Sequence, residues 1–139
     1  MTNDPNPKKQ KREEDSSSCK KYDLEERTAK FGEDVIKFLK DIPDTTITKP
    51  IKYQLTKSST SMGANYGEAD DAESAADFKH KIGICKKESR ESKHFLRMIV
   101  AAVPEKAAQA RILWQEAKEL HLIFNEIYRK VSQKIKFRR

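Results

Sequence analysis

Glycine and proline are scarce in this chain, and long hydrophobic runs are missing altogether. Only four glycines and five prolines occur in 139 residues, and every proline precedes or separates the segments with a regular apolar pattern. An all-β sandwich needs turn residues at short intervals, so this scarcity argues against that fold and favours long helices. The glycines also form no phosphate-binding loop of the kind that nucleotide-binding proteins use.

No apolar stretch approaches the roughly 20 residues that a membrane span requires. Residues 1–21 are polar throughout and lack the apolar core of a secretory signal, so we expect a cytoplasmic protein without membrane contact. The chain has two cysteines, Cys19 in this polar segment and Cys85 in an apolar pattern. They are too few for the usual kind of zinc site, and we expect no disulfide between them.

The spacing of apolar residues predicts four helices. Pro43 ends the first helix and Pro104 the third, because proline cannot continue a helix. Thr48 is the expected N-cap of the second helix, and Ser74 with Asp77 resembles the capping arrangement at the start of the third. The predicted segments are residues 24–42, 48–71, 74–102 and 105 to beyond 130.

Four amphipathic helices of similar length with short links close most economically into an antiparallel up-down-up-down bundle. We therefore predict an all-α four-helix bundle over residues 22–131. Residues 1–21 are expected to form a disordered polar tail, and residues 132–139 a basic C-terminal tail.

The third predicted helix carries the most regular pattern. Its apolar and small residues step by four and three in strict alternation, which keeps one seam on one side of the helix and predicts left-handed supercoiled packing. The seam consists of Phe78, Ile82, Cys85, Ser89, Ser92, Leu96, Ile99 and Val103.

Small residues also recur every four positions in the second helix, at Ser59, Gly63 and Gly67. Each glycine costs about 1 kcal/mol relative to alanine inside a helix, so a compensating contact is expected. One interpretation is a groove that lets another backbone approach closely. The other is that Gly67 only loosens the end of the helix.

These segments resemble a known family. The stretch SMGANYGEA at residues 61–69, then Phe78, then IGICKKESRES at residues 82–92 are similar to the four-helix-bundle proteins encoded in intervening sequences of bacterial large-subunit ribosomal RNA genes. The resemblance covers roughly residues 22–130. The chain departs from the family pattern at Ala69, where glycine is common, and at the Phe-Leu pair of residues 95–96, where Trp-Leu often stands.

The resemblance implies a bacterial cytosolic protein that assembles into a ring, a homopentamer, with no established enzymatic activity and no cofactor. A related branch is the accessory variability proteins of diversity-generating retroelements, which work with a reverse transcriptase and nucleic acid. Both branches point to RNA or DNA as a partner.

The net charge of +7 is unevenly distributed. Residues 129–139 hold six lysines and arginines and no acid, and residues 78–97 hold seven lysines and arginines against two glutamates. Such a helix is either a solvated face or a surface that contacts a polyanion. The candidate nucleic-acid contacts are Lys79, Lys86, Lys87, Arg90, Lys93, Arg97, Lys134, Lys136, Arg138 and Arg139.

Ring side chains recur every seven residues on the fourth helix, beside its apolar seam. One bundle can hardly bury them together with the further apolar residues of that helix, so they predict an oligomer interface. The alternative is that the rings form the edge of a broad core stripe. The candidate interface residues are Trp114, His121, Leu122 and Tyr128.

The sequence gives little support to the hypotheses of a catalytic site or a metal site. The Glu-x-x-His pair at Glu91 and His94 has the ligand spacing of di-iron bundle proteins, and Asp77 with His80 echoes it, but both pairs lie on one helix. A di-iron site needs such a motif on each of two helices and carboxylates from the others. We expect no metal, and His121 has no evident nucleophile to activate, so we expect no enzymatic activity.

Four polar residues are expected where the second and third helices meet, at Asn65, Glu68, Glu88 and Glu91. A partly buried network that fixes the helix register is one interpretation, because isolated buried charges are costly. A ligand pocket is the other. The leading hypothesis for the whole chain is a non-catalytic oligomeric bundle that binds RNA or DNA, and the alternative is a ring-shaped scaffold for a protein partner such as a reverse transcriptase.

Overall fold

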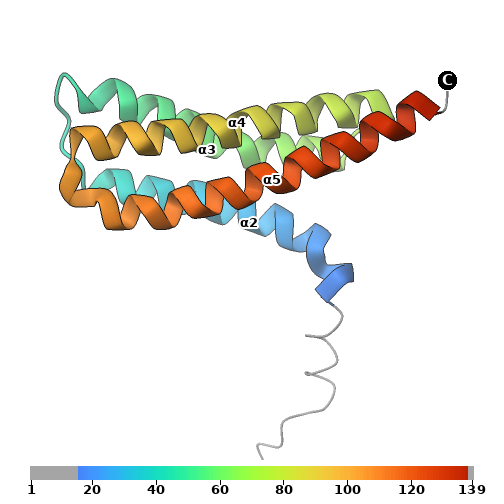
Figure 1. Ribbon diagram of the computed structural model, residues 1–139, viewed down its shortest axis with the longest axis horizontal. Coiled ribbons are helices and arrows are strands. Elements are labelled where there is room, and N and C mark those ends of the chain that lie inside the picture. The colour runs from blue at the N-terminus through green and yellow to red at the C-terminus, as the bar shows by residue number, and fades with distance from the viewer. Residues whose placement is uncertain (1–15, 138–139) are drawn as a thin grey trace, which may run out of the picture.

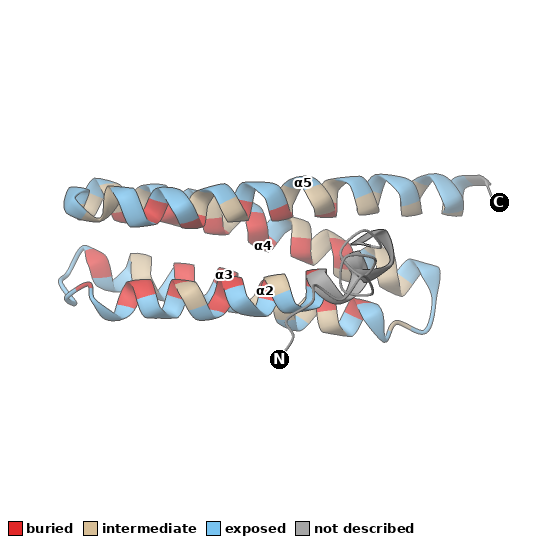
Figure 2. Ribbon diagram, turned by 90° about the horizontal axis from the view of Figure 1, so that it is seen from below, coloured by how far each residue is buried: buried red, intermediate tan, exposed pale blue. Residues whose placement is uncertain are grey.

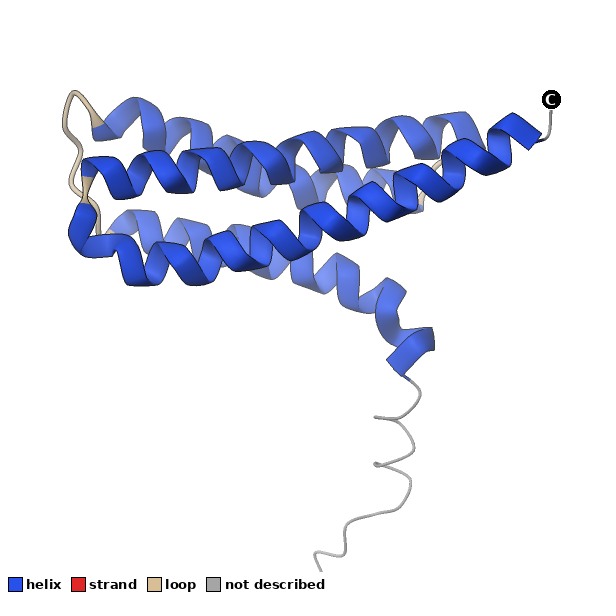
Figure 3. Ribbon diagram, viewed as in Figure 1, coloured by secondary structure: helices blue, strands red, loops and turns tan. Residues whose placement is uncertain are grey.

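The computed structural model describes the backbone of residues 16–137 and the side chains of residues 24–136. Within this part of the chain there are helices and connecting loops but no strands (Figure 3). The α-helices are α2 (Ser16–Lys40), α3 (Thr48–Asp70), α4 (Ala75–Ala102) and α5 (Ala107–Phe137), and a 3₁₀ turn, η1 (Pro104–Lys106), precedes α5.

The four α-helices form one bundle in which each helix lies beside the next in the chain. Figure 1 shows α2 and α4 running in one direction and α3 and α5 returning in the other. Contacts between α3 and α4 and between α4 and α5 are the most extensive, and α2 packs on both α3 and α5. The all-α four-helix prediction is therefore confirmed.

Two segments expected as tails are partly helical. Residues 16–21 belong to α2, and residues 132–137 extend α5 beyond the predicted bundle boundary. Val131 and Ile135 continue the apolar spacing of α5, and lysine and glutamine favour helix, which accounts for the extension. Residues 1–15 and 138–139 lie outside the described residues.

The ends of the helices follow from local hydrogen bonding. Ser74 accepts a hydrogen bond from the backbone N–H of Asp77 at 3.0 Å, so the predicted cap of α4 is confirmed. Thr48 is not the N-cap of α3, because Ile47 occupies that position. The Thr48 hydroxyl instead accepts from the Thr45 N–H at 2.8 Å and donates to the Pro43 carbonyl at 2.7 Å, which fixes the α2–α3 loop.

The core lies along the bundle axis, where the buried positions of the four helices meet (Figure 2). On α4 the predicted seam is buried from Ile82 to Ile99, and its end residues Phe78 and Val103 are half-buried. Val35 of α2, Met62 of α3 and Leu120 of α5 are fully buried against it.

The small residues of α3 bring it close to α2. A Cβ atom added to Gly63 would lie 3.4 Å from the Thr28 backbone, and one added to Gly32 would lie 3.2 Å from the Ser59 carbonyl oxygen. Gly67 has open space around it, so it takes no part in this contact. The close-approach interpretation therefore holds for Ser59 and Gly63 but does not extend to Gly67.

A sharp turn joins α4 to α5. Val103 leaves the helical conformation directly before Pro104, as the residue before a proline tends to do, and η1 then reverses the chain within three residues. This short link fixes the register of α5 against α4. Among the helices that the structure describes, none combines the length and the apolarity needed to cross a membrane.

Candidate functional site

Lysines of α4 and ring side chains of α5 repeat at the same interval on facing helices. The lysine row consists of Lys79, Lys86 and Lys93. The ring row consists of Trp114, His121 and Tyr128. Two turns return a helical residue to nearly the same side, about 10 Å further along, so each row follows one side of its helix. We call the two rows together the α4–α5 face.

Cation–π contacts join the two rows. The Nζ atoms of Lys79 and Lys86 lie 5.2 and 4.7 Å from the centroid of the Tyr128 ring. At the other end of the rows, the Nζ atom of Lys93 lies 5.2 Å from the centroid of the Trp114 ring. Each such contact is worth about 0.5–1 kcal/mol at an exposed site, so the rings restrain the lysines.

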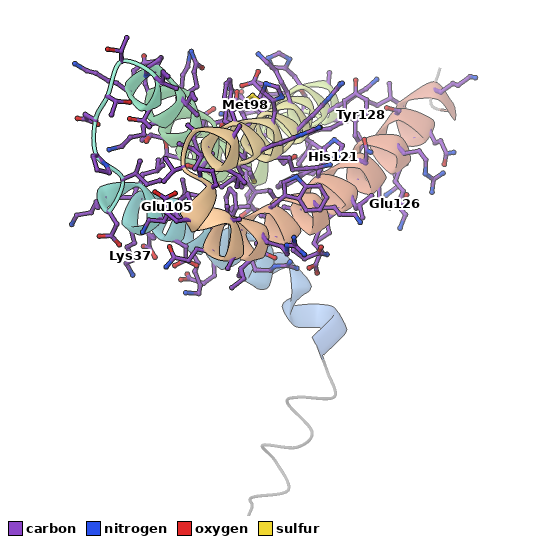
Figure 4. The ribbon with its side chains drawn as sticks, turned by 60° about the vertical axis from the view of Figure 1, so that its left-hand side comes forward. Lys37, Met98, Glu105, His121, Glu126 and Tyr128 are labelled. Carbon is purple, nitrogen blue, oxygen red and sulfur yellow. The ribbon has the colours of Figure 1, made fainter. Side chains whose placement is uncertain are left out.

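Gly83 provides the position at which Tyr128 packs on α4. An added Cβ atom would lie 3.2 Å from the Tyr128 ring, closer than a side chain normally tolerates. The glycine lies between Lys79 and Lys86 in sequence, so the ring meets the helix backbone with a lysine on the turn before and the turn after. Figure 4 shows Tyr128 and His121 on the side of α5 that faces α4, whereas Glu126 points away.

A recess of about 250 Å³ opens between α4 and α5 in the middle of this face. Its lining contains three fixed positive charges, an imidazole and a phenol, and it contains no carboxylate. The lining residues are Gly83, Lys86, Lys87, Arg90, His121 and Tyr128. We call it the central recess.

The pKa of His121 reflects its burial and the nearby cations of α4. Burial lowers the pKa of the half-buried His121 imidazole below its ordinary value of 6.5, and neighbouring positive charges lower it further. These charges belong to Lys93, Lys86 and Arg90. The imidazole is therefore neutral near pH 7, and the central recess has a positive potential that disfavours a further cation.

The remaining candidate nucleic-acid residues spread along both helices. Arg97 lines a groove of about 610 Å³ at the α4–α5 turn, together with Trp114. Lys134 and Lys136 are exposed on the last turns of α5, and Lys136 lines a groove that reaches Tyr128. Arg138 and Arg139 lie outside the described residues.

The four candidate interface residues do not share one environment. Trp114, His121 and Tyr128 are half-buried and contact or approach the lysines of α4, so they belong to the α4–α5 face. Leu122 is 56% exposed on another side of α5, beside Arg129. Ile112, at 74% exposure, is the most exposed large apolar side chain of the described residues.

Of the four polar residues expected at the α3–α4 contact, Glu68 contacts α4 and Glu91 lines a groove with Gln54 of α3. No hydrogen bond or ion pair within residues 24–136 links any two of the four. Asn65 donates to the Ser61 carbonyl of its own helix at 2.9 Å, and Glu68 pairs with Lys81 of α4 at 2.7 Å. Buried hydroxyls join the helices instead, through a 3.0 Å bond from Ser92 to Ser58.

Glu88 is the unusual member of that set. Its side chain is 8% exposed, and its Oε2 atom has no hydrogen-bond partner in the described part of the chain. Burial raises the pKa of the Glu88 carboxyl, and the nearby charge of Glu91 raises it further. Lys87 and Lys57 oppose this shift without reversing it.

The two candidate metal pairs gain no further ligands. Over residues 24–136 there is no group of three or more histidine, cysteine, aspartate or glutamate side chains that could hold a metal ion. The His94 ring instead packs edge-on against Phe95, with ring centroids 5.1 Å apart. Cys85 is buried and unpaired, and burial raises the pKa of its thiol to about 12, which makes it unreactive.

Comparison with known proteins decides the family. Residues 20–126 match the family model described as 23S rRNA-intervening sequence protein. The chain belongs to this family. The family predicted from the resemblance of residues 61–69, Phe78 and residues 82–92 is thereby confirmed.

A solved structure agrees with the family and the fold. It is a protein of unknown function from the S23 ribosomal protein family of Bacteroides thetaiotaomicron, with 25% sequence identity and a TM-score of 0.67. The match covers 76% of the present chain and 97% of the other. No curated protein matches the sequence.

Two residues that contact the α4–α5 face were not predicted from the sequence, Gly83 and Lys118. Gly83 could have been noticed in the sequence, because a glycine in the middle of a long helix needs a compensating contact. Lys118, whose Nζ atom lies 5.7 Å from the Trp114 ring centroid, could also have been noticed, because it follows Trp114 by one helical turn. Neither signal identifies the partner without the structure.

The buried carboxylate of Glu88 leads to a prediction about how stability depends on pH. Because the folded-state pKa of Glu88 is raised above 4.5, ionisation disfavours folding, and stability should fall as pH rises through that folded pKa. The substitution Glu88→Gln should raise the free energy of unfolding by about 1 kcal/mol near pH 7.5. Near pH 4 the same substitution should change the free energy of unfolding only slightly.

Urea unfolding at both pH values measures the effect, with Glu33→Gln on the exposed side of α2 as the matched control. Equal changes at the two pH values would show that ionisation of Glu88 does not oppose folding.

Proposed function

We propose that this protein is a non-catalytic bundle that binds RNA or DNA through the α4–α5 face. The observation that carries the proposal is the alignment of the lysine row with the ring row across two helices. Rigid helices hold these lysines at a regular spacing, and Lys87, Arg90 and Arg97 add positive charge on the same helix. Clustered lysines and arginines of this kind neutralise phosphates along a strand.

The proposed contact is with the phosphate backbone and not with the bases. The Tyr128 ring already packs against Gly83 and lies under two lysines, and the Trp114 ring lies under Lys93 and Lys118. The rings are therefore engaged in orienting ammonium groups, which reduces the entropy that the lysines lose on binding. Contacts to phosphates position a nucleic acid without reading its sequence.

The salt dependence of binding tests this proposal. If about four phosphates are neutralised, the affinity for a labelled single-stranded RNA should fall about 50-fold between about 50 mM and about 200 mM salt. DNA of the same sequence should show a similar slope, because both polymers present phosphates. Fluorescence anisotropy gives both affinities, and absence of binding at the lower salt concentration would refute the proposal.

Exposed apolar side chains favour a second candidate function, assembly. Ile112 and Leu122 project from α5 with most of their surface exposed, ten residues apart, and association of several chains along α5 would cover both. We propose a homo-oligomer, a ring of five on the family resemblance, that serves as a scaffold for a protein partner or as an accessory subunit of a reverse transcriptase.

The oligomer has its own test. The double substitution of Ile112 and Leu122 by glutamate should reduce the mass measured by light scattering to that of the monomer, because burying unpaired carboxylates in an interface is costly. Gln109→Glu, at another exposed position of α5, should leave the mass unchanged. An oligomer that survives the double substitution would place the interface elsewhere.

A further inference from the structure

The central recess differs in charge from the other grooves of the described residues. The groove that also contains Lys87 and Arg90 on the α3 side includes Glu91, and the neighbouring groove that shares Lys86 and Tyr128 with the recess includes Glu126. The groove at the α4–α5 turn lacks a carboxylate but has an apolar floor formed by Leu96 and Val100. Among these four, only the central recess combines three cations with no acid, whereas the groove at the α4–α5 turn has two cations.

The cations of the central recess are not neutralised within the protein. No ion pair in residues 24–136 involves Lys86, Lys87 or Arg90. Like charges held close together repel one another, and the neighbouring His121 experiences the same positive potential. An anion in the recess would remove this repulsion and accept hydrogen bonds from both helices.

We propose that the central recess binds the phosphate monoester at the end of an RNA or DNA strand. This inference rests on the proposed nucleic-acid function. A terminal monoester brings about two negative charges near neutral pH and three acceptor oxygens, whereas an internal phosphodiester brings one charge. The electrostatic attraction to the three cations is therefore stronger for a terminal monoester than for an internal phosphodiester.

The donors and the size of the recess suit this group. Arg90 supplies a planar fork of N–H donors, Lys86 and Lys87 supply ammonium groups, and His121 and Tyr128 add ring donors from α5. At about 250 Å³ the recess is smaller than the sites that hold whole drug-sized ligands, which start at about 300 Å³. It fits the end of a strand and leaves the rest of the strand to follow the lysine row.

The test compares two otherwise identical single-stranded RNAs, one with a 5′-phosphate and one with a 5′-hydroxyl, at a pH where the monoester is dianionic. The phosphorylated strand should bind about tenfold more tightly, the gain expected for one additional charge-assisted contact. Equal affinities would overturn the inference while leaving the proposed function standing. Failure of both strands to bind would refute the proposed function itself.

Variants locate the effect. Arg90→Ala and Lys87→Ala remove exposed side chains, so both variants should fold. Each should reduce the preference for the phosphorylated strand from about tenfold to below about threefold, whereas Lys130→Ala, at an exposed position of α5, should retain the full preference. The ratio of the two affinities is the readout, because it cancels any general loss of binding. A preference that survives both recess variants would overturn the assignment.

Competition with a free nucleotide distinguishes binding of the terminal phosphate from binding of the internal phosphate backbone. AMP carries the same monoester, so at millimolar concentration it should abolish the preference and leave the binding of the hydroxyl strand in place. If AMP displaces both strands equally, the recess is an ordinary backbone contact and the inference is overturned.

Discussion

Reversing the charge of Lys86 and Lys93 together should weaken RNA binding about 100-fold, because each lost charge-assisted contact costs about 1.5 kcal/mol or more. Both lysines are held over rings of α5, with Lys86 over Tyr128 and Lys93 over Trp114. A glutamate at either position removes a proposed phosphate contact and introduces repulsion. Anisotropy titration at low salt measures the loss.

A matched variant separates position from total charge. Lys30 and Lys37 lie seven residues apart on the outer side of α2, the same spacing as Lys86 and Lys93, and both are exposed. The double substitution Lys30→Glu and Lys37→Glu removes the same amount of positive charge. It should weaken binding less than about threefold, because a screened charge far from the contact acts weakly. Equal losses in the two double variants would mean that net charge, and not the α4–α5 face, attracts the nucleic acid.

The core could be predicted from the sequence because heptad spacing and helix packing impose the same constraint. Ile82, Leu96 and Ile99 are buried in the positions that the four-three pattern assigns to them. Local signals set the helix ends equally well where side-chain chemistry is specific, as at Ser74 and Pro104. Thr48 was misassigned because its hydroxyl bonds to the α2–α3 loop, a partner that a capping motif does not reveal.

The α4–α5 face could be predicted only in parts. The rings of α5 were identified from the sequence as a seven-residue repeat and assigned to an oligomer interface. The lysines of α4 were identified only as members of a basic cluster, which was assigned to nucleic acid. Whether the lysines and the rings meet depends on the register of α5 against α4, which η1 sets through a turn of three residues. A shift of one helical turn would separate Lys86 from Tyr128, and composition does not encode that distance.

The sequence also did not predict which polar side chains are buried. Glu68 and Glu88 both belong to the stretches that carry the family resemblance, but Glu68 is exposed and paired with Lys81, whereas Glu88 is buried. Which residues beside the α4 seam become covered depends on how closely α3 packs there, and α3 also packs closely on α2 at Gly32 and Gly63. The apolar periodicity identifies the buried seam of α4 but does not show whether the residues beside that seam are buried.

The largest loss of stability is expected from truncation of Phe124. Its ring is completely buried on α5 and lies against Tyr66 of α3, with centroids 6.1 Å apart and planes inclined at 48°. Phe124→Ala removes apolar surface and leaves a cavity that the rigid helices cannot fill, which costs about 3–5 kcal/mol. Small domains are stable by only about 5–15 kcal/mol, so this variant should approach the limit of folding.

Urea unfolding followed by circular dichroism measures the loss, and Ile112→Ala on the same helix is the matched control. Ile112 is 74% exposed, so its truncation should change the free energy of unfolding by less than about 0.5 kcal/mol at a fixed protein concentration. Similar losses for the two variants would mean that Ile112 is also covered, which would favour an oligomer that buries α5. A large loss for Phe124 alone would show that the bundle core holds the α4–α5 face in place without help from a partner.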